Sequence, residues 1–183
     1  LAVPFYEAVR NTSFLNAYVE MVSSLTTTGA SLFEPERLAP SVHLWRALVG
    51  WLGGFFLWVT AVAILAPLSL GGFEVMAPAT STRGAARGYA TVWASDMSQL
   101  LVRYSIRLSP IYGGLTLVLW LTLLMLGDTP LVAFCHAMST LATSGISPVG
   151  GLEGGGSAFT GELVVLIFMI FAISRQTFFS DQP

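Results

Sequence analysis

Two short stretches of this chain read alike. The first is Ser23-Ser24-Leu25-Thr26-Thr27-Thr28-Gly29-Ala30-Ser31, and the second, 116 residues further along, is Ser139-Thr140-Leu141-Ala142-Thr143-Ser144-Gly145-Ile146-Ser147. Extending both stretches back, to Phe14–Ser31 (the first copy) and Pro130–Ser147 (the second copy), gives seven identities in eighteen ungapped positions. Self-similarity at a fixed offset indicates an internal repeat, and the two copies run in the same direction.

A short helix is expected at the start of each copy. Apolar residues recur at helical spacing from Phe14 to Leu25, with Thr12 or Ser13 as the N-cap. Asp128 and Thr129 are the expected caps of the second helix, with Pro130 in its first turn, where a missing N–H costs nothing. Helices of about 12 residues are too short to cross a bilayer, which needs about 20. Residues 1–12 are expected to be an exposed lead-in.

Each copy ends in a small polar tip that suits a cation. Glycine can adopt a positive φ, which lets consecutive carbonyl oxygens turn to one side, and rings of such oxygens replace the water around a monovalent ion. The C-terminal end of the preceding helix carries partial negative charge, which also favours a cation. The candidate ion-binding residues are Thr26, Thr27, Thr28 and Gly29 (the first tip) and Ala142, Thr143, Ser144 and Gly145 (the second tip). The alternative is that each glycine simply caps its helix at the C′ position.

The composition is that of a membrane protein. Charged residues make up 10% of the chain, whereas soluble domains usually carry about a quarter. Residues 47–73 and 108–127 contain no charged side chain and are long enough to span a bilayer. The net charge of −2 argues against a nucleic-acid surface, which needs a basic excess. No nucleophile–base spacing is visible, so an enzyme is not expected.

The expected organisation is all-α, with repeated helix–pore-loop–helix units. Residues 1–73 would hold the end of a first repeat, with its pore helix, tip and spanning helix. Residues 74–107 would be a cytoplasmic or interfacial linker, because they carry an arginine excess and an amphipathic helical pattern. Residues 108–183 would form a second repeat. The chain is expected to be an internal piece of a longer protein.

Three segments carry a resemblance to a known family. Phe14–Ser31 resembles the first pore loop of the Trk/Ktr/HKT potassium transporter superfamily, closest to its TrkH branch. Trp45-Arg46 and Trp51-Leu52-Gly53-Gly54 resemble the helix that follows that loop, and His136–Ser147 resembles the second pore loop.

The resemblance implies a pseudo-fourfold cation channel, of which this chain would supply part. It implies potassium as the transported ion, no cofactor, and filters at Thr26–Gly29 and Ala142–Gly145. It further implies a multi-pass protein of the bacterial inner membrane, in contact with the lipid bilayer, forming a homodimer and gated by a cytosolic nucleotide-binding subunit of the TrkA type.

One departure from the family pattern leaves sodium as an alternative transported ion. Relatives often have Gly-Gly where this chain has Ser144-Gly145, so a sodium-permeable or sodium-coupled relative of the same fold is an alternative. A secondary transporter for an organic solute with re-entrant hairpins would predict inverted repeats, whereas these copies are parallel. A non-conducting membrane anchor would leave the repeated tip unexplained.

Three buried polar residues are expected near the tips. Glu20 and His136 occupy equivalent positions in the two short helices. They either tune the tips through hydrogen bonds or are simply satisfied by main-chain groups. Arg46 is expected to pair with Glu20, Glu34 or Glu36, because an intramembrane charge is costly without a partner. Gly53 and Gly54 are expected to serve helix packing.

Overall fold

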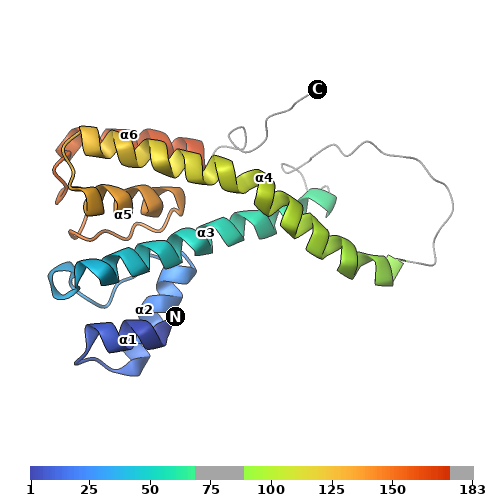
Figure 1. Ribbon diagram of the computed structural model, residues 1–183, viewed down its shortest axis with the longest axis horizontal. Coiled ribbons are helices and arrows are strands. Elements are labelled where there is room, and N and C mark those ends of the chain that lie inside the picture. Colours follow the sequence, from blue (N-terminus) through green and yellow to red (C-terminus); the bar gives the residue numbers. More distant parts are fainter. Residues whose placement is uncertain (69–88, 174–183) are drawn as a thin grey trace. The chain divides into compact units, whose positions relative to one another are not determined.

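The computed structural model describes residues 1–68 and 89–173. Within these ranges the chain is helical and contains no strand. The elements are α1 (Ala2–Val9), α2 (Phe14–Leu25), η1 (Pro35–Arg37), α3 (Pro40–Leu68), α4 (Tyr89–Met125), α5 (Pro130–Leu141) and α6 (Ala158–Ile173) (Figure 1). The expectation of an all-α protein is confirmed. The chain divides into two units, one of Leu1–Phe55 with Tyr112–Pro183 and one of Phe56–Ile111.

The two short helices, α2 and α5, begin as expected. Ser13 is the N-cap of α2, and its hydroxyl accepts a hydrogen bond from the Asn16 N–H at 3.2 Å. Pro130 is the first residue of α5, and Thr129 is the N-cap. Both helices have 12 residues, which is too few to span a bilayer.

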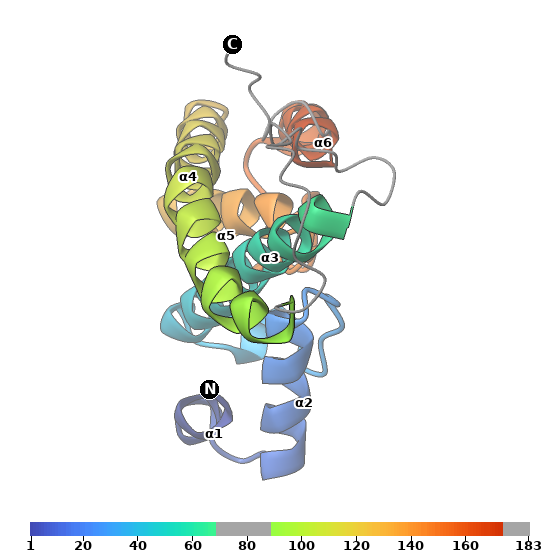
Figure 2. The same cartoon turned by 90° about the vertical axis from the view of Figure 1, so that its right-hand side faces the viewer.

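The sequence pattern predicted an exposed lead-in for residues 1–12. Most of these residues are exposed, but the segment is also helical and is docked through one buried side chain. Ala2–Val9 form helix α1, which packs beside α2 (Figure 2). The reason is Phe5, which is 1% exposed and lies against Phe33 with ring centroids 5.6 Å apart. Burying one aromatic ring stabilises the packed form by about 1.5–3 kcal/mol, which is enough to dock a helix that has no side-chain cap.

The first half of α3 lies between α2 and α5 (Figure 1). Its Val42 and Val49 belong to one apolar cluster with α1 and α2, whereas Ala47 belongs to another with Cys135 and Met138 of α5. Three glycines bring α3 close to the main chain at the ends of both short helices. A Cβ at Gly53 would collide with the Leu25 carbonyl, and one at Gly54 would lie 2.9 Å from the Ala142 Cα. The third, Gly50, faces the Ser24 carbonyl oxygen. These contacts agree with the expected packing role of Gly53 and Gly54.

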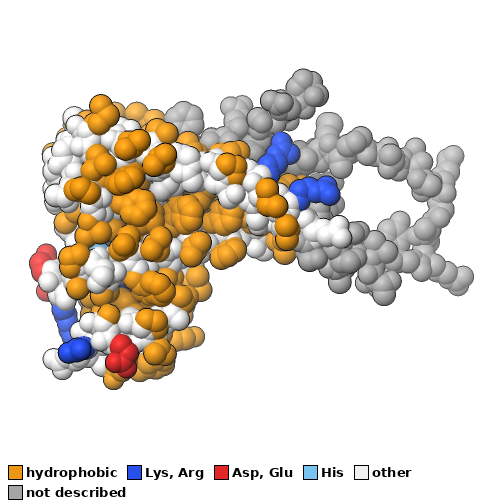
Figure 3. Space-filling model, viewed as in Figure 1, with side chains coloured by type: hydrophobic (Ala, Val, Ile, Leu, Met, Phe, Trp, Pro, Cys, Tyr) orange, Lys and Arg blue, Asp and Glu red, His pale blue; other side chains and the backbone are white. Residues whose placement is uncertain are grey.

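Among the described residues, two helices are long and apolar enough to cross a membrane. They contain the segments Pro40–Ala63 and Leu101–Met125. Hydrophobic side chains cover most of the described surface that faces the viewer in Figure 3. Large hydrophobic side chains of α4 and α6, such as Leu121, Met125, Leu163 and Ile170, are exposed in this chain.

Helix α4 is continuous across Leu108, where the second repeat is expected to begin. Residues 89–125 form one helix that contains Pro110, so the amphipathic segment and the apolar segment are continuous. A proline within a helix removes one main-chain hydrogen bond, and here it does not end the helix. Residues 74–88 of the expected linker and residues 174–183 of the expected second repeat lie outside the described residues.

The part of α4 that belongs to the first unit is fixed to α3 by polar contacts. The Trp51 indole N–H donates to the Thr116 hydroxyl at 2.9 Å, and the Tyr112 hydroxyl donates to the Trp51 carbonyl at 3.2 Å. Tyr112 also lies against the Phe55 ring, with centroids 5.5 Å apart. These contacts hold α4 against the helix that positions both tips.

We expect Gly53→Ala to destabilise the protein by about 1–3 kcal/mol, the usual cost of overpacking, because the new methyl group meets the Leu25 main chain. The matched control is Gly114→Ala in α4, where a Cβ meets nothing within 4 Å among the described residues. That variant should be neutral or up to about 1 kcal/mol more stable, because alanine favours helix over glycine. The measurement is the thermal unfolding midpoint in detergent, and equal midpoints for the two variants would contradict the packing argument.

Candidate functional site

The two tips adopt the same backbone conformation. The residue after each short helix has an ordinary φ, −82° at Thr26 and −79° at Ala142. The next residue is left-handed, with φ 55° at Thr27 and 54° at Thr143. The glycine two positions later is again at positive φ, 76° at Gly29 and 69° at Gly145.

The main-chain hydrogen bonds of the two turns also match. In the first tip, the Thr28 N–H donates to the Ser23 carbonyl at 3.0 Å, and in the second the Ser144 N–H donates to the Ser139 carbonyl at 3.0 Å. A second, shorter turn lies within each of these. The Thr27 N–H donates to the Ser24 carbonyl, and the Thr143 N–H donates to the Thr140 carbonyl, both at 3.1 Å. This is the Schellman arrangement that ends many helices.

The residue that caps each helix is therefore a threonine and not the glycine. Glycine usually occupies the left-handed C′ position, but here Thr27 and Thr143 do. A β-branched residue in this region is a real outlier and costs about 1–3 kcal/mol. The reading in which Gly29 and Gly145 are ordinary C′ caps is thus wrong, because Thr27 and Thr143 occupy that position, and each glycine lies two residues further along at a positive φ of its own.

The two tips meet at Gly29 and Ser144. A Cβ at Gly29 would collide with the Ser144 carbonyl oxygen, so only glycine allows this approach. The Ser144 side chain is buried and turned away from the contact, with its hydroxyl 3.1 Å from that of Ser139. Gly145 has open space on its Cβ side. Of the eight candidate residues, Gly29 and Ser144 are the pair for which the structure gives a direct contact between the tips.

The main-chain oxygens of the tips are unoccupied by protein donors. Within the described residues, no carbonyl of Thr26–Gly29 or Ala142–Gly145 accepts a hydrogen bond. An unpaired carbonyl oxygen needs water or another partner, and the Ser144 carbonyl oxygen lies against Gly29. The side chains are more restricted, because the hydroxyls of Thr26 and Thr28 bond to each other at 2.8 Å.

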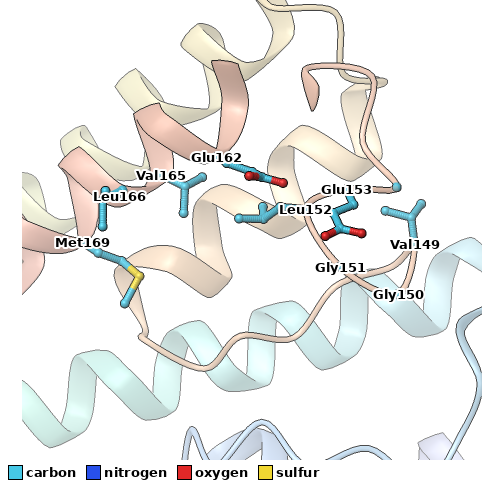
Figure 4. A pocket seen from close by; sticks show the side chains of 10 residues that line it. Val149, Gly150, Gly151, Leu152, Glu153, Glu162, Val165, Leu166 and Met169 are labelled. Carbon is cyan, nitrogen blue, oxygen red and sulfur yellow. The ribbon is translucent and has the colours of Figure 1, made fainter. Parts of the chain in front are cut away.

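One cavity adjoins the second tip and another adjoins the loop that follows it, and neither was expected from the sequence. A cavity of about 280 Å³ is lined by residues of α5, the second tip and α6, including His136, Thr143 and Met169. A wider cavity of about 690 Å³ lies between the loop 149–154 and α6, and the carboxylates of Glu153 and Glu162 line it (Figure 4). The run of glycines in this loop was the signal that its main chain could fold against α6.

The Arg46 partner is Glu20. Their side chains form an ion pair in which the arginine is 2% exposed and the glutamate is fully buried. Glu20 was one of three candidates, and it is buried as Arg46 is, whereas Glu34 and Glu36 are exposed.

Comparison with known proteins identifies the relatives of the chain. No family model matches it. The Trk system potassium uptake protein TrkI of Halomonas elongata is 31% identical over 147 residues, which is 80% of this chain and 28% of that protein. The TrkH proteins of Vibrio parahaemolyticus and Escherichia coli are 29% and 28% identical, over 91% and 93% of this chain. The chain spans about a third of the length of these relatives, from 28% to 34%.

The two apolar helices of membrane-spanning length among the described residues, together with these relatives, indicate a membrane protein similar to the Trk system potassium uptake proteins. The chain is a TrkH-type sequence, and the resemblance to that branch is confirmed.

We expect Thr27→Gly to stabilise the protein by about 1 kcal/mol, because glycine removes the left-handed strain that an L-residue bears there. The neighbouring change Thr26→Gly is the control. Thr26 has an ordinary φ, so the extra freedom of glycine should destabilise by about 0.5–1 kcal/mol. Thermal unfolding of the two variants checks the sign, and a loss of stability in both would mean that the left-handed turn carries no strain.

Proposed function

We propose that this chain is part of the ion-conducting subunit of a Trk-type potassium uptake system, and that its two tips hold K⁺ through main-chain oxygens. The observation that carries the proposal is the contact between two tips that share one unusual backbone turn. Two loops that arrive at one point in the same conformation can present their carbonyl oxygens to a common ion.

The chemistry of the tips fits a monovalent cation. Carbonyl oxygens are uncharged ligands that can replace the hydration shell of K⁺, whereas divalent cations prefer carboxylates. Helices α2 and α5 end at the tips, so the partial negative charge of their C-terminal ends favours a cation there. The membrane potential would then drive entry, with about 2.3 kcal/mol per charge per 100 mV. No covalent chemistry is required.

The complete protein would contain further copies of the same unit. Two tips cannot surround an ion, so the pseudo-fourfold pore needs helix–pore-loop–helix units from outside this chain. We place the whole protein in the bacterial inner membrane as a multi-pass homodimer, with a cytosolic TrkA-type nucleotide-binding subunit as its regulator. The arginines of residues 74–107 would lie on the cytoplasmic side, as positive charge in membrane proteins usually does.

The test is rubidium uptake by the complete transporter with Gly29→Val or Gly145→Val. A β-branched residue cannot adopt the positive φ of these glycines without strain, so we expect uptake to fall by about tenfold or more, a barrier change of about 1.4 kcal/mol. Gly114→Ala, which is distant from both tips in the sequence and meets nothing nearby, is the control and should transport normally. Undiminished, still selective uptake in both valine variants would rule out the tips as the filter.

A second candidate keeps the fold and changes the ion to sodium, and Ser144 is the observation that favours it. In the potassium case an excess of sodium should leave rubidium uptake largely unchanged, and Ser144→Gly should have little effect because its hydroxyl bonds to Ser139 and not to the ion path. In the sodium case sodium should compete strongly, and Ser144→Gly should weaken that competition. Initial rates of rubidium uptake with and without sodium distinguish the two.

A further inference from the structure

The last residue of each copy is tied back to its own short helix by an equivalent hydrogen bond. In the first copy the Ser31 hydroxyl lies 3.1 Å from Glu20 Oε1 and 3.0 Å from the Phe33 carbonyl oxygen, and its one hydrogen is directed to these two acceptors. In the second copy the Ser147 hydroxyl and the His136 Nε2 are 2.9 Å apart. Each serine lies two residues after the tip glycine, so the bond closes a loop that contains the whole tip.

In the first copy this tie is part of a buried charged network. The second oxygen of Glu20 accepts a hydrogen bond from the Leu32 N–H at 2.8 Å. One nitrogen of Arg46, Nη2, pairs with Glu20 Oε1 and also donates to the Ser31 hydroxyl at 2.9 Å. Both oxygens of the carboxylate therefore accept hydrogen bonds, and two of the donors, Ser31 and Leu32, belong to the segment that follows the tip.

The second copy achieves the same tie with different groups. The Ser147 hydroxyl donates to the Gly151 carbonyl at 3.0 Å and accepts from the Val149 N–H at 3.2 Å. On the other side of the ring, the His136 Nδ1 lies 3.8 Å from an Asp128 oxygen. Burial in the short helix α5 lowers the pKa of His136, and Asp128 opposes that shift. The second copy thus keeps the hydrogen bond between the serine and the short helix, although among the described residues it has no counterpart of the ion pair between Glu20 and Arg46.

The network fixes the far end of the first tip. The near end is already held by the Schellman turn, in which Thr28 bonds to Ser23. The far end, at Ser31 and Leu32, is held by the Glu20 carboxylate. A segment of main chain that is fixed at both ends keeps its carbonyl oxygens in one place. Discrimination between ions of similar charge depends on the positions of those oxygens.

We propose that Glu20 and Arg46 are positioning residues for ion selection. They do not touch the ion, but they hold the segment of main chain whose carbonyl oxygens contact it. The proposal rests on the proposed function. It assigns a role to a buried ion pair that could otherwise be replaced by apolar residues at little cost, since such pairs contribute weakly to stability.

The experiment measures the ratio of rubidium to sodium uptake by the complete transporter in proteoliposomes. In Glu20→Gln the neutral amide cannot hold both donors of the strand as the carboxylate does, so the ratio should fall about tenfold, which corresponds to about 1.4 kcal/mol. This variant leaves Arg46 buried without a partner, which can prevent folding. The double variant Glu20→Gln with Arg46→Met removes that problem, and it should fold, reach the membrane in normal amount and still show the reduced ratio.

Two further variants distinguish a role in positioning the segment from a general effect of changing charge near the tip. Arg46→Lys should keep most of the ratio, because a single nitrogen makes both contacts and a lysine ammonium can replace it. Glu34→Gln removes the same charge from an exposed side chain of the same loop, and its ratio should equal that of the unchanged protein.

Three results would overturn the proposal. They are a normal ratio in the double variant, a lower protein amount with an unchanged ratio, and an equal loss of selectivity in Glu34→Gln. Failure of the proposed function is a different result, because the unchanged protein itself would then take up no rubidium.

Discussion

The close approach of α3 to the ends of two short helices is the constraint on which the site depends. Gly53 lies against the main chain of Leu25, and Gly54 lies against Ala142. Because both tips start from residues that touch the same helix, their separation is set by α3 and not by the flexible lengths of the loops. Small residues at helix interfaces allow such approach in membrane proteins, where packing rather than the hydrophobic effect drives association.

The energetic counterpart of that packing is the strain in the tips. Thr27 and Thr143 hold a backbone conformation that is unfavourable for β-branched residues, and they do so at equivalent positions. Strain of this kind persists only where surrounding contacts enforce it, and it gathers at functional sites. Here three sets of contacts enforce the conformation: those within the short helix before each tip, those with α3, and the serine hydrogen bond after each tip. The left-handed conformation of Thr27 and Thr143 is therefore held from three sides.

Sequence reasoning reached the parts of this structure that are set by local chemistry. The cap at Ser13, the proline at the start of α5 and the extents of both short helices follow from spacing and capping rules. It missed α1, because a short helix without a cap gives almost no periodic signal and is stabilised by the burial of Phe5. The contact between Gly29 and Ser144 was also beyond the sequence, because it joins residues far apart in the chain and depends on how α3 packs. The same holds for the choice of Glu20 among three possible partners of Arg46.

The differences between the copies show what the repeat preserves. At the position where the first copy has Glu20, the second has His136, so the charge beneath the tip is not the shared property. The hydroxyl of Ser31 or Ser147 is present in both, and it can donate to a carboxylate or bond to an imidazole. The shared requirement is thus mechanical: the strand after the glycine must be attached to the helix before it. Because the attachment is kept while its chemistry changes, the property that the two copies share is the path of the main chain after the glycine and not the identity of the side chain that holds it.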